Sequence, residues 1–220
     1  MRASDLFSRD DVASIESAID AAERATDAEI VPVVASASGR YDRAEDLFGL
    51  CLALITLATA WIALDSGGPG AASWASAGLG LGAALALVLV GFVVGAALAS
   101  RITALRLPFI SRAEMHEEVE RGAREAFQRE RIRTTTNGAG VLIYVSLHER
   151  LVRVLADDRA AEHLSAAMLE EICALVTDGL KRGAPADGLR DAISRTGELL
   201  ANALPASGTS ELPNRLVLRD

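Results

Sequence analysis

Two adjacent carboxylates, Asp157 and Asp158, are the residues of this sequence best suited to chemistry. They follow an apolar run at 151–156, and Glu162 and His163 come shortly after them. Hard cations such as Ca²⁺ and Mg²⁺ need several oxygen ligands, and paired carboxylates in a loop supply two or three. The sequence therefore offers Asp157 and Asp158 as candidate ligands for Ca²⁺ or Mg²⁺. The commoner role of such a pair after a strand is a solvated turn that caps the next helix.

Other catalytic patterns are incomplete in this sequence. It has no Gly-x-Ser-x-Gly nucleophile elbow and no Walker phosphate loop. His148 and Glu149 lack the second histidine of a zinc-protease helix, and Cys173 lies on an apolar helix face without an evident base. We therefore assign no catalytic residue and no organic cofactor, and whether the chain is an enzyme stays open.

The distribution of charge limits the partners. The chain has 30 acidic and 22 basic residues, a net charge of −8 and no basic stripe. Lys and Arg contacts to phosphates supply most of the affinity for nucleic acid, so no nucleic-acid partner is expected. Mean hydropathy is +0.26 although 24% of residues are charged, because Asp65 is the only charged residue between Asp46 and Arg101. A wholly soluble single domain and a polytopic transporter are both excluded.

The apolar block at 47–102 predicts a two-helix transmembrane hairpin. Its two helices are expected at about 47–64 and 78–99, each long enough to cross a hydrocarbon layer of ~30 Å at about 1.5 Å per residue. Trp61 and Trp74 fall near the same end of the two helices, where indole rings favour the membrane interface. The lipid bilayer is therefore the first expected partner.

The flanks of the hairpin predict its orientation. The tip at 65–77 has no basic residue, whereas arginines stand on both outer flanks. By the positive-inside rule, both termini and the polar domain lie in the cytoplasm. The alanine-rich, almost lysine-free composition suggests a bacterial genome rich in G and C, so the expected location is a bacterial cytoplasmic membrane. The flanking arginines are Arg40, Arg43, Arg101, Arg106 and Arg112.

Gly91 and Gly95 form a Gly-x-x-x-Gly step in the second apolar helix. Small residues at this spacing allow two helix backbones to approach closely. Packing against the other helix of the same hairpin is the favoured interpretation, because that neighbour is already present. The alternative is a homodimer formed through Gly91 and Gly95.

The polar sequence on the two sides of the hairpin predicts one domain. Residues 1–46 contain a helix that begins at Ser8 and a strand at 29–35, which cannot bury a core alone. Pro32 places this strand at a sheet edge or a bulge, because proline cannot donate to a ladder. The domain is therefore expected to continue in 111–204, with 205–220 as a mobile tail.

The second part of the domain predicts the remaining elements. A helix is expected from a cap at Ser111 to about Arg133, with Glu and Arg spaced to pair along it. Strands follow at 141–145 and 151–156. A helix begins at Ser165, and Asp187 can cap the last one. The first two strands should be parallel and the third antiparallel. The predicted fold class is α/β, a small mixed sheet between helices (α/β/α), interrupted by the hairpin.

Three segments resemble the TPM domain, the thylakoid-lumen phosphatase-like family. They are the stretches AEIVPVV from Ala28, NGAGVLIYVS from Asn137 and LVRVLAD from Leu151. The chain is similar to the bacterial members that carry a transmembrane hairpin inside this domain. The resemblance covers about 8–46 and 111–204, and implies an α/β/α sandwich.

The resemblance also implies two kinds of function. Some plant members are described as phosphatases with a bound metal, and others as factors for repair or assembly of membrane complexes. Here Asp157-Asp158-Arg159-Ala160-Ala161 replaces the family's usual glycine-rich stretch after the third strand. We therefore expect a membrane-anchored, non-enzymatic module that binds or helps to assemble a membrane protein complex. The alternative is a metal-dependent phosphatase near the membrane surface.

Overall fold

The computed structural model describes residues 2–39, 41–65, 80–102, 105, 107–134, 138–206 and 212–220. Several predicted features lie outside these residues: the hairpin tip with Trp74 and Gly78, and also Arg40, Arg106 and Asn137. The chain divides into two compact units. Unit 1 consists of Met1–Gly39 and Met115–Asp220, and unit 2 of Arg40–Glu114.

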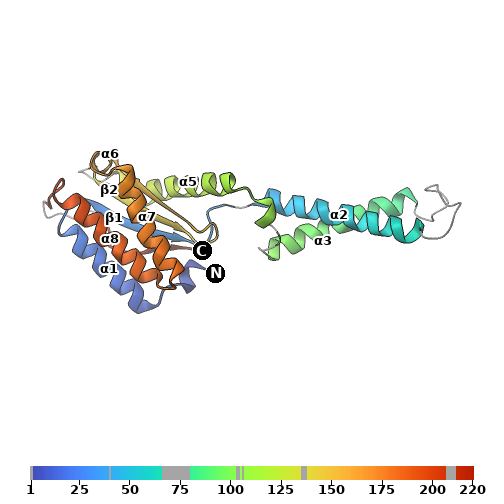
Figure 1. The fold of residues 1–220 in the computed structure, drawn as a ribbon, viewed down its shortest axis with the longest axis horizontal. Coiled ribbons are helices and arrows are strands. Elements are labelled where there is room, and N and C mark those ends of the chain that lie inside the picture. Colours follow the sequence, from blue (N-terminus) through green and yellow to red (C-terminus); the bar gives the residue numbers. More distant parts are fainter. Residues whose placement is uncertain are drawn as a thin grey trace. The chain divides into compact units, whose positions relative to one another are not determined.

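Unit 1 is built on a four-stranded mixed sheet. Its strands are β1 (Glu29–Ala35), β2 (Gly140–Ser146), β3 (Leu151–Ala156) and β4 (Val217–Arg219), in the order β3-β2-β1-β4. β1 is parallel to both β2 and β4, and β2 is antiparallel to β3. The predicted directions of the first three strands are confirmed (Figure 1).

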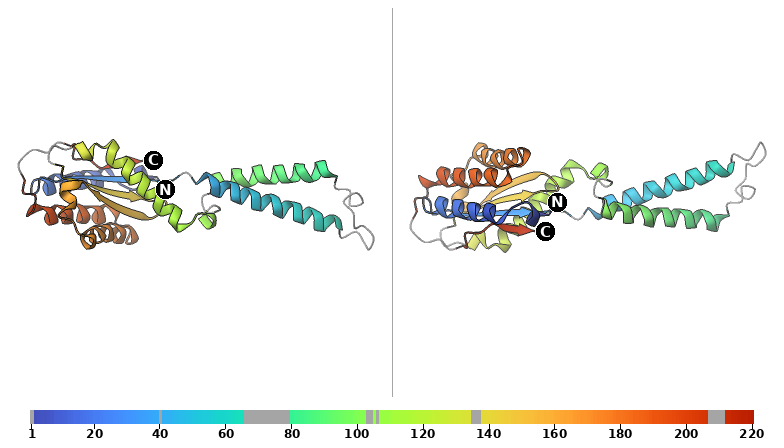
Figure 2. Two further views of the ribbon diagram at one scale, coloured as in Figure 1. Left: turned by 90° about the horizontal axis from the view of Figure 1, so that it is seen from above. Right: turned by 90° about the horizontal axis from the view of Figure 1, so that it is seen from below.

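Helices cover both faces of this sheet, which confirms the predicted α/β/α layers (Figure 2). α1 (Arg9–Glu23), α7 (Ala166–Lys181) and α8 (Pro185–Ala201) pack on one face. α5 (Arg112–Arg129) packs on the other. Because side chains alternate along β1, Ile30 and Val34 enter the first core, and Val31, Val33 and Ala35 enter the second.

β1 lies inside the sheet, so the edge position or bulge expected from Pro32 is wrong. Glu29 N donates to Ala139 O on the β2 side, and Ser36 N donates to Arg219 O on the β4 side. By alternation, the Pro32 nitrogen faces the β4 side. β4 pairs only with Val33–Ala35, so the missing donor of Pro32 stands just before this ladder begins.

The C-terminal segment also differs from the expectation of a mobile tail. Its last residues form β4, and Leu216 beside it is buried. Three residues are too few to show a period in the sequence. The strand forms because β1 offers a parallel edge there.

Side-chain caps fix the starts of α1 and α7. Ser8 and Asp11 form a reciprocal capping box at α1, and the hydroxyl of Ser165 accepts from Met168 N at α7. α8 begins at Pro185, so Asp187 lies in its first turn and is not the cap. Proline suits this first position because its missing N–H would have no helical partner. α5 ends at Arg129, earlier than predicted, and a 3₁₀ turn (Ile132–Thr134) follows.

Unit 2 contains two long apolar helices, α2 (Asp42–Asp65) and α3 (Leu81–Arg101). Length and composition allow both to cross a membrane. They pack through small residues: a Cβ at Gly95 would lie 2.8 Å from the Cα of Gly49, and one at Gly91 would lie 2.9 Å from the Cα of Ala53. This is the intramolecular packing favoured for the glycine step. A homodimer through Gly91 and Gly95 stays a prediction and would have to displace α2.

Candidate functional site

The predicted metal ligands lie at the end of β3 that borders the start of β2. Asp157 N donates to Gly140 O (2.8 Å), and Arg159 N donates to Gly138 O (3.1 Å), which fixes the chain at this point. Asp157 is buried and Asp158 is exposed, at the start of the short helix α6 (Asp158–Ala161). Asp157 occupies the N-cap position, but its side chain makes no capping hydrogen bond.

The two carboxylates do not by themselves make a closed cation site. A hard cation needs more oxygen ligands than two side chains provide. Glu162 and His163 are exposed, and no group of three or more His, Cys, Asp or Glu suited to a metal occurs within the described ranges. Asp157 and Asp158 as ligands of Ca²⁺ or Mg²⁺ therefore stay a prediction, in which backbone carbonyls or water supply the other positions.

A different polar cluster, mostly buried, lies at the opposite end of the strands, where β1 and β2 end. Ser38 Oγ lies 3.0 Å from the Tyr144 hydroxyl and donates to Ser146 Oγ at 2.8 Å. Ser146 Oγ donates in turn to the carboxylate of Glu149. Glu149 Oε1 also accepts from the backbone N–H groups of Ser38 (3.1 Å) and Gly39 (3.3 Å). We call these four side chains the Glu149 cluster.

The proton direction in this cluster follows from its acceptor. An ionised carboxylate only accepts, so the single hydroxyl proton of Ser146 points to Glu149. The Ser38 proton then points to Ser146, and the Tyr144 phenol donates to Ser38. Every hydroxyl proton in the cluster is thus committed to a neighbour.

Close packing holds Tyr144 in this position. A Cβ at Gly122 of α5 would lie 2.7 Å from the Tyr144 hydroxyl. The phenol is 2% exposed, and burial raises its pKa above the ordinary value, against the smaller lowering effect of the Ser38 hydrogen bond. The arrangement therefore keeps Tyr144 neutral as a hydrogen-bond donor.

The place of this cluster is where open α/β sheets usually bind ligands. β1 has β2 as its neighbour on one side and β4 on the other, so the strand order changes direction at β1. Ligands of open α/β sheets favour the carboxyl ends of the strands at such a point. Here the chain's own groups occupy it. Ala3 N donates to Ser36 Oγ (2.7 Å), and Asp220 Oδ1 accepts from Ser36 Oγ (3.0 Å) and Ser4 N (3.2 Å). Hydrogen bonds from Ser4 are the main cause that lowers the pKa of the Asp220 carboxyl.

Sequence reasoning missed the Glu149 cluster. It considered Glu149 only with His148, as an incomplete zinc motif, and gave Ser38 no role. Ser38 lies more than a hundred positions from its partners, so no local pattern connects them. The one local signal is the spacing of Ser146 and Glu149, which a tight turn brings together.

An α/β/α sandwich that shares its chain with two apolar helices is thus the class this fold defines. Residues 99–199 match the family model described as the TPM domain. The match agrees with the resemblance that the strand motifs indicated. No curated protein matches the chain.

The fold is also similar to a solved structure. This is the NMR structure of BA42 protein from the psychrophilic bacterium Bizionia argentinensis, with a TM-score of 0.56 and 16% identity. The match covers 96% of this chain and 94% of that chain. At this identity the similarity supports the fold alone.

Proposed function

We propose that this protein is a membrane-anchored TPM module without enzymatic activity, which binds or helps to assemble a membrane protein complex. The observation that carries the proposal is the surface of α2 and α3. Their large apolar side chains point away from the pair, while their small residues face each other. A water-soluble helix pair has the reverse arrangement.

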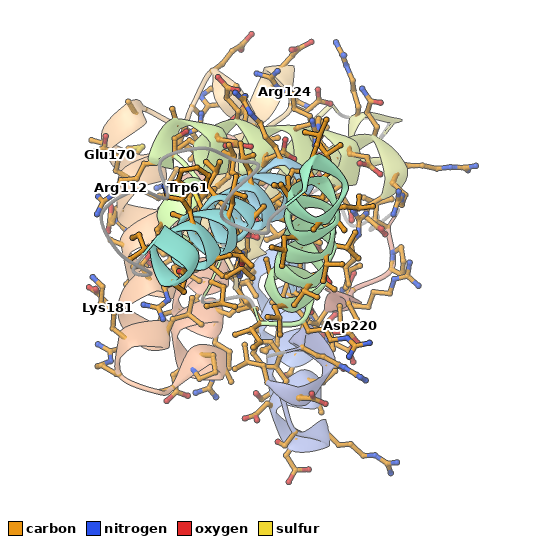
Figure 3. The ribbon with its side chains drawn as sticks, turned by 90° about the vertical axis from the view of Figure 1, so that its right-hand side faces the viewer. Trp61, Arg112, Arg124, Glu170, Lys181 and Asp220 are labelled. Carbon is orange, nitrogen blue, oxygen red and sulfur yellow. The ribbon has the colours of Figure 1, made fainter. Side chains whose placement is uncertain are left out.

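The exposed fractions make this contrast quantitative. Ile62 on α2 is 66% exposed and Leu89 on α3 is 64% exposed, whereas Ala53 and Ala99 are fully buried. Protein buries only 11% of the apolar stretch of α2 and 17% of that of α3. Removing one such side chain from water is favourable by about 1.5–3 kcal/mol. A lipid bilayer removes the apolar side chains from water along the whole helix. Figure 3 draws the side chains of the two helices as sticks, with Trp61 labelled on α2.

The Glu149 cluster supports a structural role of this position in preference to catalysis. It stands at the usual ligand position of the sheet, but its hydroxyl protons are committed internally and the adjoining N-terminal residues occupy the rest. The charged face of α5 is similarly self-paired: Arg121 with Glu118, Arg124 with Glu120 and Arg129 with Glu125. Such exposed pairs are worth tenths of a kcal/mol and are typical of a solvated face.

The arginines at the helix ends support one orientation of the anchor. Arg43 lies at the start of α2 and Arg101 at the end of α3. By the positive-inside rule, these arginines support a location of the domain and both termini in the cytoplasm of a bacterium. A reporter enzyme fused after Asp220 that is active only outside the cytoplasm should be inactive. An active fusion would reverse this orientation.

Extraction of cell membranes tests the anchor, and affinity capture in mild detergent then tests the module. The wild type should stay in the membrane after an alkaline carbonate wash. Leu85→Arg with Leu89→Arg should release or destabilise it, because each charge at the bilayer centre costs about 2.5–3.5 kcal/mol. Ser100→Arg, at the exposed helix end, is the matched control. Complete extraction of the wild type would contradict the anchor, and capture without any membrane protein would contradict the module.

The alternative function is a metal-dependent phosphatase, which Asp157 and Asp158 would serve. Hydrolysis of a generic phosphomonoester is measured with and without Ca²⁺ or Mg²⁺. Activity that both Asp157→Asn and Asp158→Asn abolish would favour the enzyme and reject the non-enzymatic module. A folded protein without activity under either condition would reject the phosphatase.

A further inference from the structure

β3 is an edge strand whose outer main-chain groups face away from the sheet. Asp157 N donates to Gly140 O of β2, so alternation turns the N–H and C=O groups of Val152, Val154 and Ala156 to the outer side. Among the described residues, none pairs its main chain with this edge. The thiol of Cys173 on α7 donates to Val152 O at 3.7 Å and is a polar group that contacts the edge.

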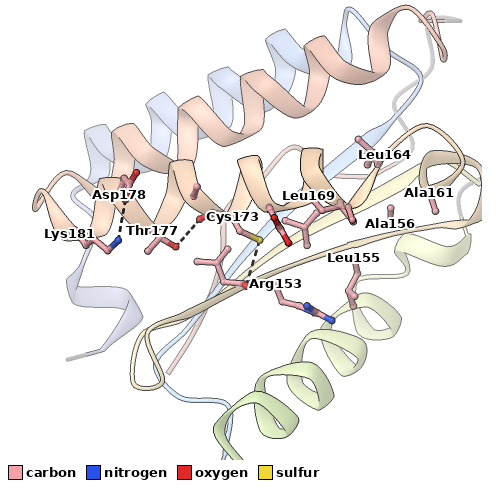
Figure 4. A pocket seen from close by; sticks show the side chains of 15 residues that line it. Arg153, Leu155, Ala156, Ala161, Leu164, Leu169, Cys173, Thr177, Asp178 and Lys181 are labelled. Carbon is pink, nitrogen blue, oxygen red and sulfur yellow. Dashed lines mark hydrogen bonds and ion pairs between the residues drawn. The ribbon is translucent and has the colours of Figure 1, made fainter. Parts of the chain in front are cut away.

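A groove runs along this edge between β3 and α7 (Figure 4). It encloses about 730 Å³. Its floor is mainly apolar, formed by alternate residues of β3 and by Leu164, Leu169 and Cys173. Arg153 and Leu155 point from β3 to the other side, toward α5 (Figure 4). The groove thus combines main-chain groups of β3 that pair with no other strand and an apolar surface beside them.

One charge in the groove has no counter-ion among the residues that the structure describes. Arg153 pairs with Glu120 and Lys181 pairs with Asp178. Glu170, exposed on α7, forms no ion pair with any residue that the structure describes. An occupant with a positive charge at this point would complete the pairing.

We propose that the β3 edge binds an extended, basic-apolar segment of a partner protein by strand addition. The segment pairs with Val152, Val154 and Ala156, places every second side chain against Leu169 and Cys173, and sets a Lys or Arg opposite Glu170. An extended peptide fits because it offers donors and acceptors at the strand spacing. A lipid chain offers neither. The inference deepens the proposed function by naming how the module recognises its partner.

Selection from a display library of random twelve-residue peptides tests this, with the full chain in detergent micelles and empty micelles as counter-selection. Enriched peptides should alternate apolar residues and carry one Lys or Arg. They should slow hydrogen exchange at the amides of Val154 and Ala156. N-methylation of alternate peptide amides should weaken binding about tenfold, because it removes strand hydrogen bonds without touching the protein's fold.

Two protein variants complete the design. Glu170→Lys should weaken basic peptides about tenfold, whereas Glu162→Lys, an exposed charge outside the groove, should not. No enriched pattern, or peptides that tolerate N-methylation and leave Val154 unprotected, would overturn the proposal. So would a β3-dependent homodimer, abolished by Val154→Pro, which would make a second copy the occupant. None of these results alters the membrane-extraction test, so the two proposals fail separately.

Discussion

Glu149 holds the backbone of Ser38, a residue 111 positions earlier in the chain, through a 3.1 Å hydrogen bond. Ser38 lies in the segment that follows β1, and Glu149 lies in the turn between β2 and β3. The carboxylate also accepts from Gly39 N and from the Ser146 hydroxyl. One buried side chain therefore fastens the β1 exit to the β2–β3 hairpin.

Glu149→Gln should loosen this connection. The amide keeps one acceptor oxygen but loses the charge, and hydrogen bonds to charged groups are worth about 1.5–3 kcal/mol. We expect faster hydrogen exchange at Ser38 and Gly39 and a loss of stability of that order. Glu162→Gln, on an exposed side chain, is the control and should change neither. Unchanged exchange at Ser38 would show that the carboxylate does not hold the segment.

Tyr144 predicts a decline of stability at alkaline pH. Its pKa is raised by burial in the folded chain, so the unfolded chain ionises first as the pH rises past about 10. The stabilisation is complete below that pH and is lost as the pH approaches the folded-state pKa. In Tyr144→Phe this contribution is absent. The stability advantage of the wild type, from urea unfolding at several pH values, should therefore shrink above about pH 10. A constant difference between the two proteins would contradict the raised pKa.

The sequence was informative wherever local pattern decides structure. The all-apolar run of β2 indicated a strand covered on both faces, and Ser8 and Ser165 marked two helix starts. Contacts between distant segments could not be read in this way. β4 exists only because β1 exposes an edge at Val33–Ala35, and Ser38 meets Glu149 only after the sheet has formed. The candidate site was therefore predicted less well than the fold.

The α2–α3 contact predicts a difference between two glycines of α3. At Gly95 a side chain would collide with the backbone of Gly49, whereas at Gly82 it would meet nothing within 4 Å. Gly95→Leu should separate the helices, and Gly82→Leu should not. Disulfide cross-linking of cysteine pairs placed on the two helices measures this in membranes, after Cys51→Ala and Cys173→Ala remove the two native thiols. Equal cross-linking in both variants would show that the helices do not pack through Gly95.

Deletion of residues 215–220 tests the fourth strand, because it removes β4 together with Leu216 and Asp220. Burial of a leucine alone contributes about 1.5–3 kcal/mol, and the β4 ladder and the Asp220 hydrogen bonds to Ser4 and Ser36 are lost as well. We expect the stability of unit 1 to fall by at least this amount, measured as hydrogen exchange of β1 and β2 amides during urea unfolding. The exposed β1 edge should also promote aggregation.

Arg215→Gln keeps the strand and removes only an exposed ion pair with Glu130, so it should change stability by less than about 1 kcal/mol. If the deletion and Arg215→Gln unfold alike, β4 is not part of the stable sheet.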